Sequence, residues 1–435
     1  MFIRMHGVGG AKDLPIPAEY AIAGACAALT VSFVVLAVAW HKPRFTENAA
    51  GHVDEAGAPG GPLIEPVLRV LGFAFFLYVA AAALLGKDTL INPVFGVFYV
   101  LLWVGIVPLS LAFGPVYRAL SPVRTLNLLL AKISGSDPDA GLREYPKRLG
   151  YWPAAFGLLA FVWMELVFAG NAELGNVRLW LAVYLGAMLV GGAVYGNTFF
   201  ARADPFEVYS TLVGHLSPLR RIDGRVRLAN PFRHLASLDV HPGLVAVCAV
   251  LLGSTAFDSL GSSTLWLTNT QDLVISRQTV GLVGLVGLVL VVGLLFAGAT
   301  MATGVHEGHQ RRMLPGAFAH TIVPIIVGYV FAHYLSMLVE SGQQTLIQLS
   351  DPLSDGSNLL GMSDRGVNYW LSEHPTFLAT TKVLGVLTGH VVAVIAAHDA
   401  ALRLLPKRDQ LSGQLALLLL MVGFTAGGLL LLFGV

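Results

Sequence analysis

Ionisable side chains occur inside apolar stretches of this chain that are long enough to cross a membrane. A charge or an imidazole in such a stretch is energetically costly, so these residues are the first candidates for function. Carboxylates and imidazoles can relay protons, act as general bases or bind a divalent metal. The candidates in the apolar stretches are Glu165, Asp258, His320, His333, His390 and His398.

Three of these residues lie at one predicted depth. Glu165, Asp258 and His333 each follow the inner start of a predicted span by about 15–16 residues, or about 22–24 Å of ideal helix. His390 lies on a span that runs the other way, about 15 Å above its inner end. We therefore expect an outer site that joins Glu165, His333 and His390, with Asp258 nearby.

The residue types of this outer site suit a divalent metal. Two neutral imidazoles and a carboxylate can bind zinc or a similar ion and leave one position for water. We therefore predict His333, His390 and Glu165 as ligands of zinc or copper. Glu165 and Asp258 are the candidate catalytic carboxylates, because a carboxylate can act as a general base.

A second group of histidines is expected at the inner ends of the spans. His320 and His398 share this level and lie close to His306 and His309. We predict His320 and His398 as further metal ligands, in an inner site that His306 or His309 would complete.

Each candidate also has a structural interpretation. Glu165 can form a hydrogen bond to a neighbouring helix, and His333 and His390 can join helices in the same way. Asp258 can lie at the boundary between lipid and water, and His398 can pair with Asp399 at a helix end. The sequence leaves these alternatives open.

The composition identifies the elements that must position these residues. Of the 435 residues, 55% are hydrophobic and 12% are charged, about half the charged share of a typical soluble domain. The mean hydropathy is +0.70, and apolar runs reach about 20 residues, enough for a helix to cross a bilayer. We therefore predict an all-α, polytopic transmembrane helix bundle that forms one integral membrane domain over residues 1–435. The ten predicted spans are 18–40, 66–85, 94–113, 150–170, 178–198, 242–260, 279–302, 317–340, 377–400 and 412–433.

The basic residues predict the orientation. With the amino terminus outside, all but seven of the 27 lysines and arginines fall on the inner side, as the positive-inside rule requires. Both termini then lie outside. This topology explains the basic loops without a nucleic-acid partner. The expected partners are the lipid bilayer and a small apolar substrate or an ion.

Three loops are long. Residues 114–149 and 199–241 contain "LSPVRTL" and "LSPLRRI", and we predict cytoplasmic amphipathic segments along the inner membrane face, with a solvated basic loop as the alternative. Residues 341–376 form the longest outer loop, either a lid or a plain connection. The chain contains no Walker loop and no Rossmann glycine pattern, so no nucleotide or flavin cofactor is expected.

Several stretches together resemble one family. They are "WPAAFGLLAFVWMELVF", "ADPFEVYSTLVGHLSPL", "AHTIVPIIVGYVFAHYLSMLV" and "GHVVAVIAAHDAAL", and they are similar to bacterial, chiefly actinobacterial, membrane proteins named fenitrothion hydrolase. The resemblance implies a multi-pass protein of the bacterial cytoplasmic membrane that hydrolyses apolar, organophosphate-like esters. A metal held by Glu165, His333 and His390 would activate a bound water for attack on phosphorus.

Two other functions fit the same residues. In a transporter or permease they would relay protons or bind an ion, and the glycine-rich stretch "GLVGLVGLVLVVGLLFAG" would suit helices that move. In a copper-handling or assembly protein, His6 and methionines such as Met337 and Met362 would bind copper. The three functions remain alternatives on the sequence alone.

Overall fold

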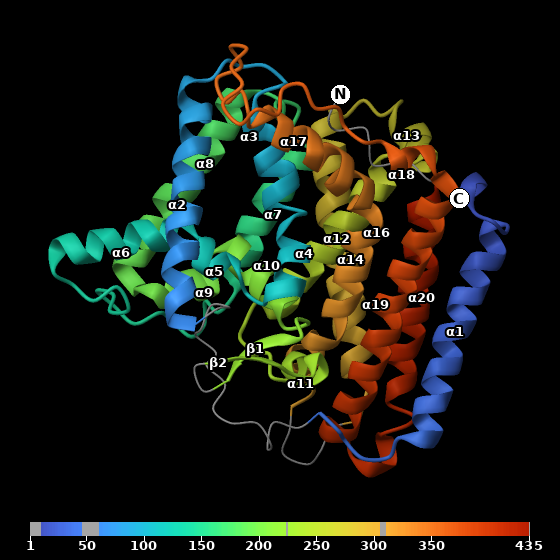
Figure 1. Cartoon of the computed structure of the whole chain (residues 1–435). Coiled ribbons are helices and arrows are strands. Elements are labelled where there is room, and N and C mark those ends of the chain that lie inside the picture. The colour runs from blue at the N-terminus through green and yellow to red at the C-terminus, as the bar shows by residue number, and fades with distance from the viewer. Residues whose placement is uncertain (1–9, 46–60, 223–224, 305–309, 435) are drawn as a thin grey trace.

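Long apolar helices dominate the structure, a computed structural model that describes residues 10–45, 61–222, 225–304 and 310–434 (Figure 1). Eight helical segments in this described part are long and apolar enough to cross a membrane. The chain is therefore a multi-pass helical membrane protein, as its composition predicts. The long helices are α1 (Ala18–Ala39), α2 (Gly61–Leu85), α8 (Leu174–Tyr195), α12 (Leu244–Gly261), α14 (Arg277–Met301), α16 (Val323–Ser336, within the continuous span Arg311–Gln348), α19 (Pro375–Leu404) and α20 (Gln414–Phe433).

Two of the ten predicted spans are not found as one long continuous helix. Residues 94–113 form α3 (Pro93–Gly96), a π-helical segment η3 (Val97–Leu102) and α4 (Ile106–Phe113), with a bend of 44° between the two halves. If this bent pair crosses the membrane as one unit, the number of candidate spans rises to nine. Residues 150–170 contain α7 (Trp152–Leu166), which at 15 residues is shorter than a typical span. The predicted number of ten is therefore reached only if both the bent pair and the short helix α7 cross the membrane.

Short elements connect and extend these spans. They are η2 (Ala11–Asp13), α5 (Tyr117–Leu120), α6 (Pro122–Ser134), α9 (Asn197–Ala203), α10 (Pro205–Gly214), β1 (Leu219–Ile222), β2 (Arg225–Leu228), α11 (Pro231–Ala236), α13 (Thr264–Thr270), η4 (Arg311–Met313), α15 (Leu314–Phe318), η5 (Ala319–Ile322), η6 (Met337–Ser341), α17 (Gly342–Gln348), α18 (Trp370–Glu373) and η7 (Lys407–Asp409). Strands β1 and β2 form one antiparallel hairpin, in which Leu219 pairs with Leu228.

A polar residue followed by proline begins four of the short helices. Asn92, Ser121, Asp204 and Asn230 cap α3, α6, α10 and α11, and each side chain accepts a hydrogen bond from a backbone N–H of the first turn. Proline fits the next position because the first N–H groups of a helix have no partner within the helix. The "SP" of the first inner loop therefore begins α6. The same dipeptide in "LSPLRRI" precedes strand β1 instead.

The second inner loop is more than a surface segment. Within residues 199–241, every residue of α10 except Thr211 is buried, and α10 packs between α4 and α7. In Figure 1 this helix lies in the middle of the molecule, below α7. The loop therefore contributes to the interior of the bundle.

The candidate site residues lie on the central helices. About two thirds of the apolar window in α12 and 72% of that in Arg311–Gln348 are buried, against 22% for α1, α14 and α20. The peripheral helices thus face the lipid, whereas α12 and α16 face protein.

Helices α16 and α19 approach closely at their glycines. A Cβ atom on Gly389 would lie 2.5 Å from the carbonyl oxygen of Pro324, and one on Gly328 would lie 2.7 Å from that of Gly385. Small residues permit this approach of two helix backbones. The crossing fixes α16, which carries His333, against α19, which carries His390.

Candidate functional site

Asp258 and His333 meet between two central helices. The Nε2 atom of His333 on α16 lies 2.9 Å from Oδ2 of Asp258 on α12. The side chain of His333 is 4% exposed and that of Asp258 is 11% exposed. This contact brings together two of the residues that the sequence selects, and most of the Asp258 side chain is buried.

Three hydroxyl groups extend this pair at both ends. The Oγ atom of Ser259 lies 3.1 Å from Nδ1 of His333 and 3.0 Å from the hydroxyl of Tyr329. At the other end, the Tyr334 hydroxyl donates a hydrogen bond of 2.9 Å to Oδ2 of Asp258. Five side chains from α12 and α16 thus form one hydrogen-bonded chain, which runs from Tyr329 to Tyr334.

The sequence reasoning missed Ser259, Tyr329 and Tyr334. A signal for two of them was present, because Tyr329 precedes His333 by one helical turn and Ser259 directly follows Asp258. Hydroxyl groups are common in apolar helices, where they usually bond to their own backbone. Their role here depends on which helix faces which.

Glu165 is buried within electrostatic range of this chain. Its side chain belongs to α7 and is 5% exposed, and its charge interacts with that of Asp258. The Oε2 atom has no hydrogen-bond partner among the described residues. The expected neighbourhood of Glu165 and Asp258 is therefore present, but as an electrostatic interaction and not as a shared ligand set.

His390 points to its own helix. Its Nδ1 atom lies 2.9 Å from the carbonyl oxygen of Val386, one turn earlier on α19. Its Nε2 atom is buried and has no hydrogen-bond partner in the described part of the chain.

The two inner histidines have different surroundings. His398 uses both ring nitrogens: Nδ1 lies 2.8 Å from Oε1 of Gln414 and Nε2 lies 2.9 Å from the carbonyl oxygen of Trp40. It thereby ties α19 to α20 and to the end of α1. The structural alternative for this residue, a pair with Asp399, is wrong, because both ring nitrogens have these other partners. His320 is buried in η5, within electrostatic range of Arg403.

The predicted metal ligands are not gathered into a metal-binding group. Over the described ranges 10–45, 61–222, 225–304 and 310–434, no three His, Cys, Asp or Glu side chains are grouped so that they could hold a metal ion. The set of Glu165, His333 and His390 is therefore not preassembled. His6, His306 and His309 lie outside the described residues.

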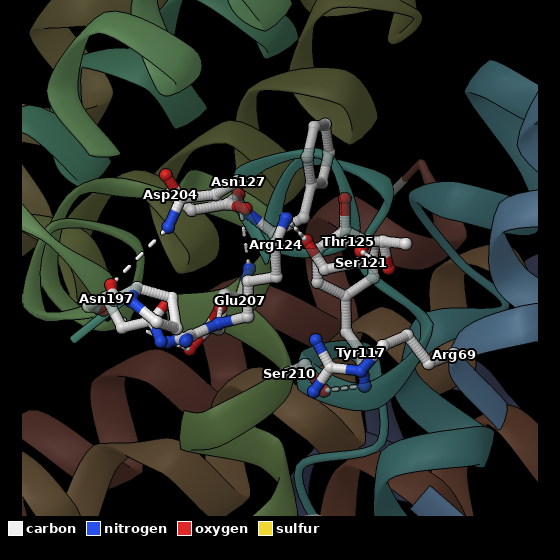
Figure 2. A network of polar contacts seen from close by, with 12 residues as sticks. Arg69, Tyr117, Ser121, Arg124, Thr125, Asn127, Asn197, Asp204, Glu207 and Ser210 are labelled. Carbon is white, nitrogen blue, oxygen red and sulfur yellow. Dashed lines mark hydrogen bonds and ion pairs between the residues drawn. The ribbon is translucent and has the colours of Figure 1, made fainter. Parts of the chain in front are cut away.

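A second buried charged network, the inner network, joins residues mainly from the two loops that the sequence predicts to be inner (Figure 2). The guanidinium of Arg124 on α6 donates to both carboxylate oxygens of Glu207 on α10, at 2.5 and 2.6 Å, and to the carbonyl oxygen of Asn197 at 3.2 Å. Asp204 caps α10 and accepts a hydrogen bond of 3.0 Å from the Tyr184 hydroxyl. The sequence reasoning did not select these residues, because it treated both inner loops as basic surface.

Two further histidines pack against each other near the end of α10. The rings of His215, at the end of α10, and His234, on α11, have centroids 4.5 Å apart. Burial is the main cause that lowers the pKa of His215 to about 4, and burial followed by the charge of His215 lowers the pKa of His234 from its ordinary value. Both rings therefore stay neutral near pH 7.

Comparison with family models, curated proteins and solved structures finds no match for this chain.

Proposed function

We propose that this chain is a proton-coupled membrane transporter in which the Asp258–His333 pair binds and releases the coupling proton. The observation that supports it is the hydrogen-bonded chain of five side chains between α12 and α16. Ionisable residues inside membrane proteins commonly mark proton relays. An imidazole is suited to this role because its protonation changes near neutral pH.

The hydrogen bonds around His333 can be satisfied in both protonation states. With a neutral ring, the Ser259 hydroxyl donates to Nδ1, and Nε2–H donates to Asp258. When Nδ1 takes up a proton, it donates to Ser259 instead. The Ser259 hydrogen then turns to the carbonyl oxygen of Thr255, which lies 3.4 Å away. Rotation of one hydroxyl therefore accompanies the proton, and no buried polar group loses its partner.

The charge of the pair also favours a proton-dependent change. Without the proton, Asp258 carries one negative charge beside a neutral imidazole. With the proton, the imidazolium and the carboxylate together are neutral. A neutral pair is less costly in a low-dielectric interior than a single charge, so proton binding can alter the preferred arrangement of α12 and α16.

Helix α16 has features that suit movement. Pro324 lies in its first turn, and the segment after His333 is the π-helix η6. Prolines and π-helical turns are places where helices bend, and π-helical turns often occur at functional sites. In this proposal, α16 moves against α12 when the proton is gained or lost.

The proposal includes an orientation. The ten segments cross the bacterial cytoplasmic membrane with both termini outside, because this arrangement places most basic residues in the cytoplasm. In Figure 1, α1 begins and α20 ends on one side, which is also the side of the loop between α17 and α18. The Asp258–His333 pair then lies in the outer half of the membrane.

Proton uptake can be measured directly on the protein in lipid. Infrared difference spectra between pH 5 and pH 9 should contain imidazole and carboxyl bands that disappear in Asp258→Asn and His333→Gln. Vesicles that contain the protein and an internal pH dye should change their internal pH when a membrane potential, a sodium gradient or a potassium gradient is imposed. The exposed His374→Gln variant is the matched control and should behave as the wild type. If wild-type vesicles respond to none of these gradients more than empty vesicles do, the proposal is wrong.

A second candidate is the ester hydrolase that the family resemblance implies. Ser259, His333 and Asp258 are bonded in the order of a hydrolase triad. Ser259 would attack phosphorus or an acyl carbon and give its proton to Nδ1 of His333, which would return it to the leaving alcohol. Water would then release the acid from Ser259.

Ser259→Ala separates these two functions. A serine nucleophile is indispensable, so the variant should lose at least about 1,000-fold in hydrolysis of a nitrophenyl ester or phosphotriester. A proton relay needs only the acid–base pair, so the same variant should still show the infrared bands of Asp258 and His333. Hydrolysis that is lost with Ser259, without proton movement in vesicles, would favour the hydrolase.

A further inference from the structure

Three buried polar atoms near Glu165 make no hydrogen bond of normal length and angle within the described part of the chain, although the indole of Trp103 is directed toward Tyr334. They are Oε2 of Glu165 on α7, the indole Nε1 of Trp103 after η3, and the hydroxyl of Tyr209 on α10. All three side chains are buried, and Tyr209 is completely so. A buried polar atom without a partner costs about 1–3 kcal/mol, so three in one region require an explanation.

These three side chains belong to one neighbourhood. The rings of Trp103 and Tyr209 have centroids 5.3 Å apart, and Trp103 also packs on Phe161 at 5.0 Å. Phe161 lies one helical turn before Glu165 on α7. The charge of Glu165 also interacts with the Tyr209 hydroxyl. The three atoms thus lie where α7, α10 and the bent third span meet.

The donor and acceptor types of this group match water. The indole N–H can only donate, the carboxyl oxygen Oε2 can accept, and the phenol can do both. A water molecule can accept from Trp103 and donate to Glu165 and Tyr209, and internal waters typically make about three such bonds. A metal cation or an ammonium group fits less well, because the indole N–H would face it with its positive end.

The group is connected to the proposed proton site through Tyr334. The Tyr334 hydroxyl donates to Asp258, and the same residue lies beside Trp103 and within electrostatic range of Glu165. Tyr334 therefore stands between the Asp258–His333 pair and the three atoms.

We propose that Glu165, Trp103 and Tyr209 hold internal water, and that this water makes Glu165 a second proton-binding carboxylate in exchange with Asp258. A proton that leaves the Asp258–His333 pair is taken up by the water, which passes another of its protons to Glu165. Glu165 becomes neutral, and the first pair regains its negative charge. This inference rests on the proposed transport function, which it extends toward the inner side through α10.

The water can be tested without any transport assay. The full-length protein in lipid nanodiscs is exposed to short X-ray pulses in ¹⁸O-labelled water, so that water held beside a side chain marks it with ¹⁸O, as mass spectrometry detects. Trp103 and Tyr209 should be labelled despite their burial. Labelling of both should fall several-fold in Glu165→Leu and stay near the wild-type level in Glu165→Gln, which keeps a polar group of the same shape.

A second variant guards against misfolding of Glu165→Leu. Tyr209→Phe keeps the ring and removes only the hydroxyl, so labelling of Trp103 should again fall. If Trp103 and Tyr209 remain unlabelled at doses that label the exposed Tyr369 and Trp370, the proposed water is absent and the inference is overturned.

The role of Glu165 is tested in the vesicles described above. Glu165→Gln should keep the infrared bands of the Asp258–His333 pair but lower proton movement at least tenfold. If Glu165→Gln moves protons at the wild-type rate while Asp258→Asn does not, Glu165 is not a second proton-binding carboxylate, and the transport proposal remains. If both variants behave as the wild type, the transport proposal itself is wrong.

Discussion

The two buried charged networks of this protein differ in whether their charge can change. In the inner network, Arg124 and Glu207 form a two-pronged pair whose side chains are 5% and 2% exposed. Arginine stays protonated in proteins, so the guanidinium of this pair keeps its charge at any physiological pH. In the central site, His333 takes the place of the arginine, and an imidazole can release its proton.

The geometry of the two networks follows this difference. The guanidinium holds both Glu207 oxygens and the carbonyl of Asn197 at once, which fixes α6 against α9 and α10. The imidazole contacts one oxygen of Asp258 and a hydroxyl that can rotate. The inner network thus has a fixed charge and fixed hydrogen bonds, whereas the charge and the hydrogen bonds of the central pair can change. The following variants test this difference.

The largest effect is expected from breaking the fixed pair. Arg124→Leu leaves Glu207 buried without its counter-charge and should lower the free energy of unfolding by about 3–5 kcal/mol. The double variant Arg124→Leu/Glu207→Leu should recover most of this loss, because no charge then remains buried. Chemical denaturation in detergent measures both. A single variant as stable as the wild type would show that the inner pair is not a structural lock.

The central pair should respond in the opposite way. Asp258→Asn and His333→Gln keep the shape and part of the hydrogen bonding, so each should cost only about 1–2 kcal/mol of stability, yet proton movement in vesicles should be lost. The same unfolding assay and the vesicle assay measure these two quantities. If either variant loses as much stability as Arg124→Leu, the two networks do not differ in their contribution to stability, and the comparison is wrong.

Substitution of a histidine that only connects helices should lower stability without changing proton binding. His398→Leu removes hydrogen bonds to Gln414 and to the Trp40 carbonyl and should cost about 1–3 kcal/mol without changing the infrared bands of His333. His390→Leu is the matched control, because its ring bonds only to its own helix at Val386. We expect it to cost less than His398→Leu, as unfolding curves would show.

The stability of the protein should depend on pH through His215 and His234. Burial lowers the pKa of His215 to about 4, so the folded state favours the neutral ring. The stability from this group is fully present above its ordinary pKa of about 6.5 and is lost as the pH falls toward 4. His215→Gln/His234→Gln should therefore lose less stability between pH 7 and pH 4 than the wild type does.

Asp204 makes the comparison with this double variant necessary. Burial raises the pKa of Asp204 to about 7, so its contribution to stability has the opposite sign and is lost as the pH rises from about 4 to 7. Because Asp204 is present in both proteins, the difference between their melting temperatures isolates the histidines. Parallel melting curves at every pH would contradict this prediction.

The smallest effect is expected from a partly exposed ion pair near the inner network. Arg69 and Glu65 lie one turn apart on α2 at 3.0 Å, with side chains that are 24% and 27% exposed. Glu65→Gln should cost only about 0.3–0.5 kcal/mol, because water screens such pairs. A cost comparable with that of Arg124→Leu would mean that burial is not what separates the fixed pair from other ion pairs.

The sequence by itself determined the class of protein and most of its helices. Runs of about 20 apolar residues have one stable arrangement in lipid, so their composition alone predicts spanning helices. Capping residues followed by proline also mark helix starts locally, as at Asn92, Ser121, Asp204 and Asn230. The cost of a buried charge singled out Asp258 and His333, and these two do meet.

The contacts of each polar residue depend on the tertiary structure and do not follow from the sequence pattern. The rotation of each helix about its axis and the bend of the third span place His333 on Asp258 and Ser259, and leave His390 bonded to Val386. The depth of a residue along a helix is local and follows from the sequence, whereas the direction of its side chain depends on packing with distant segments. For the same reason, the burial of α10 and the Arg124–Glu207 pair could not be read from loops that look basic and solvated.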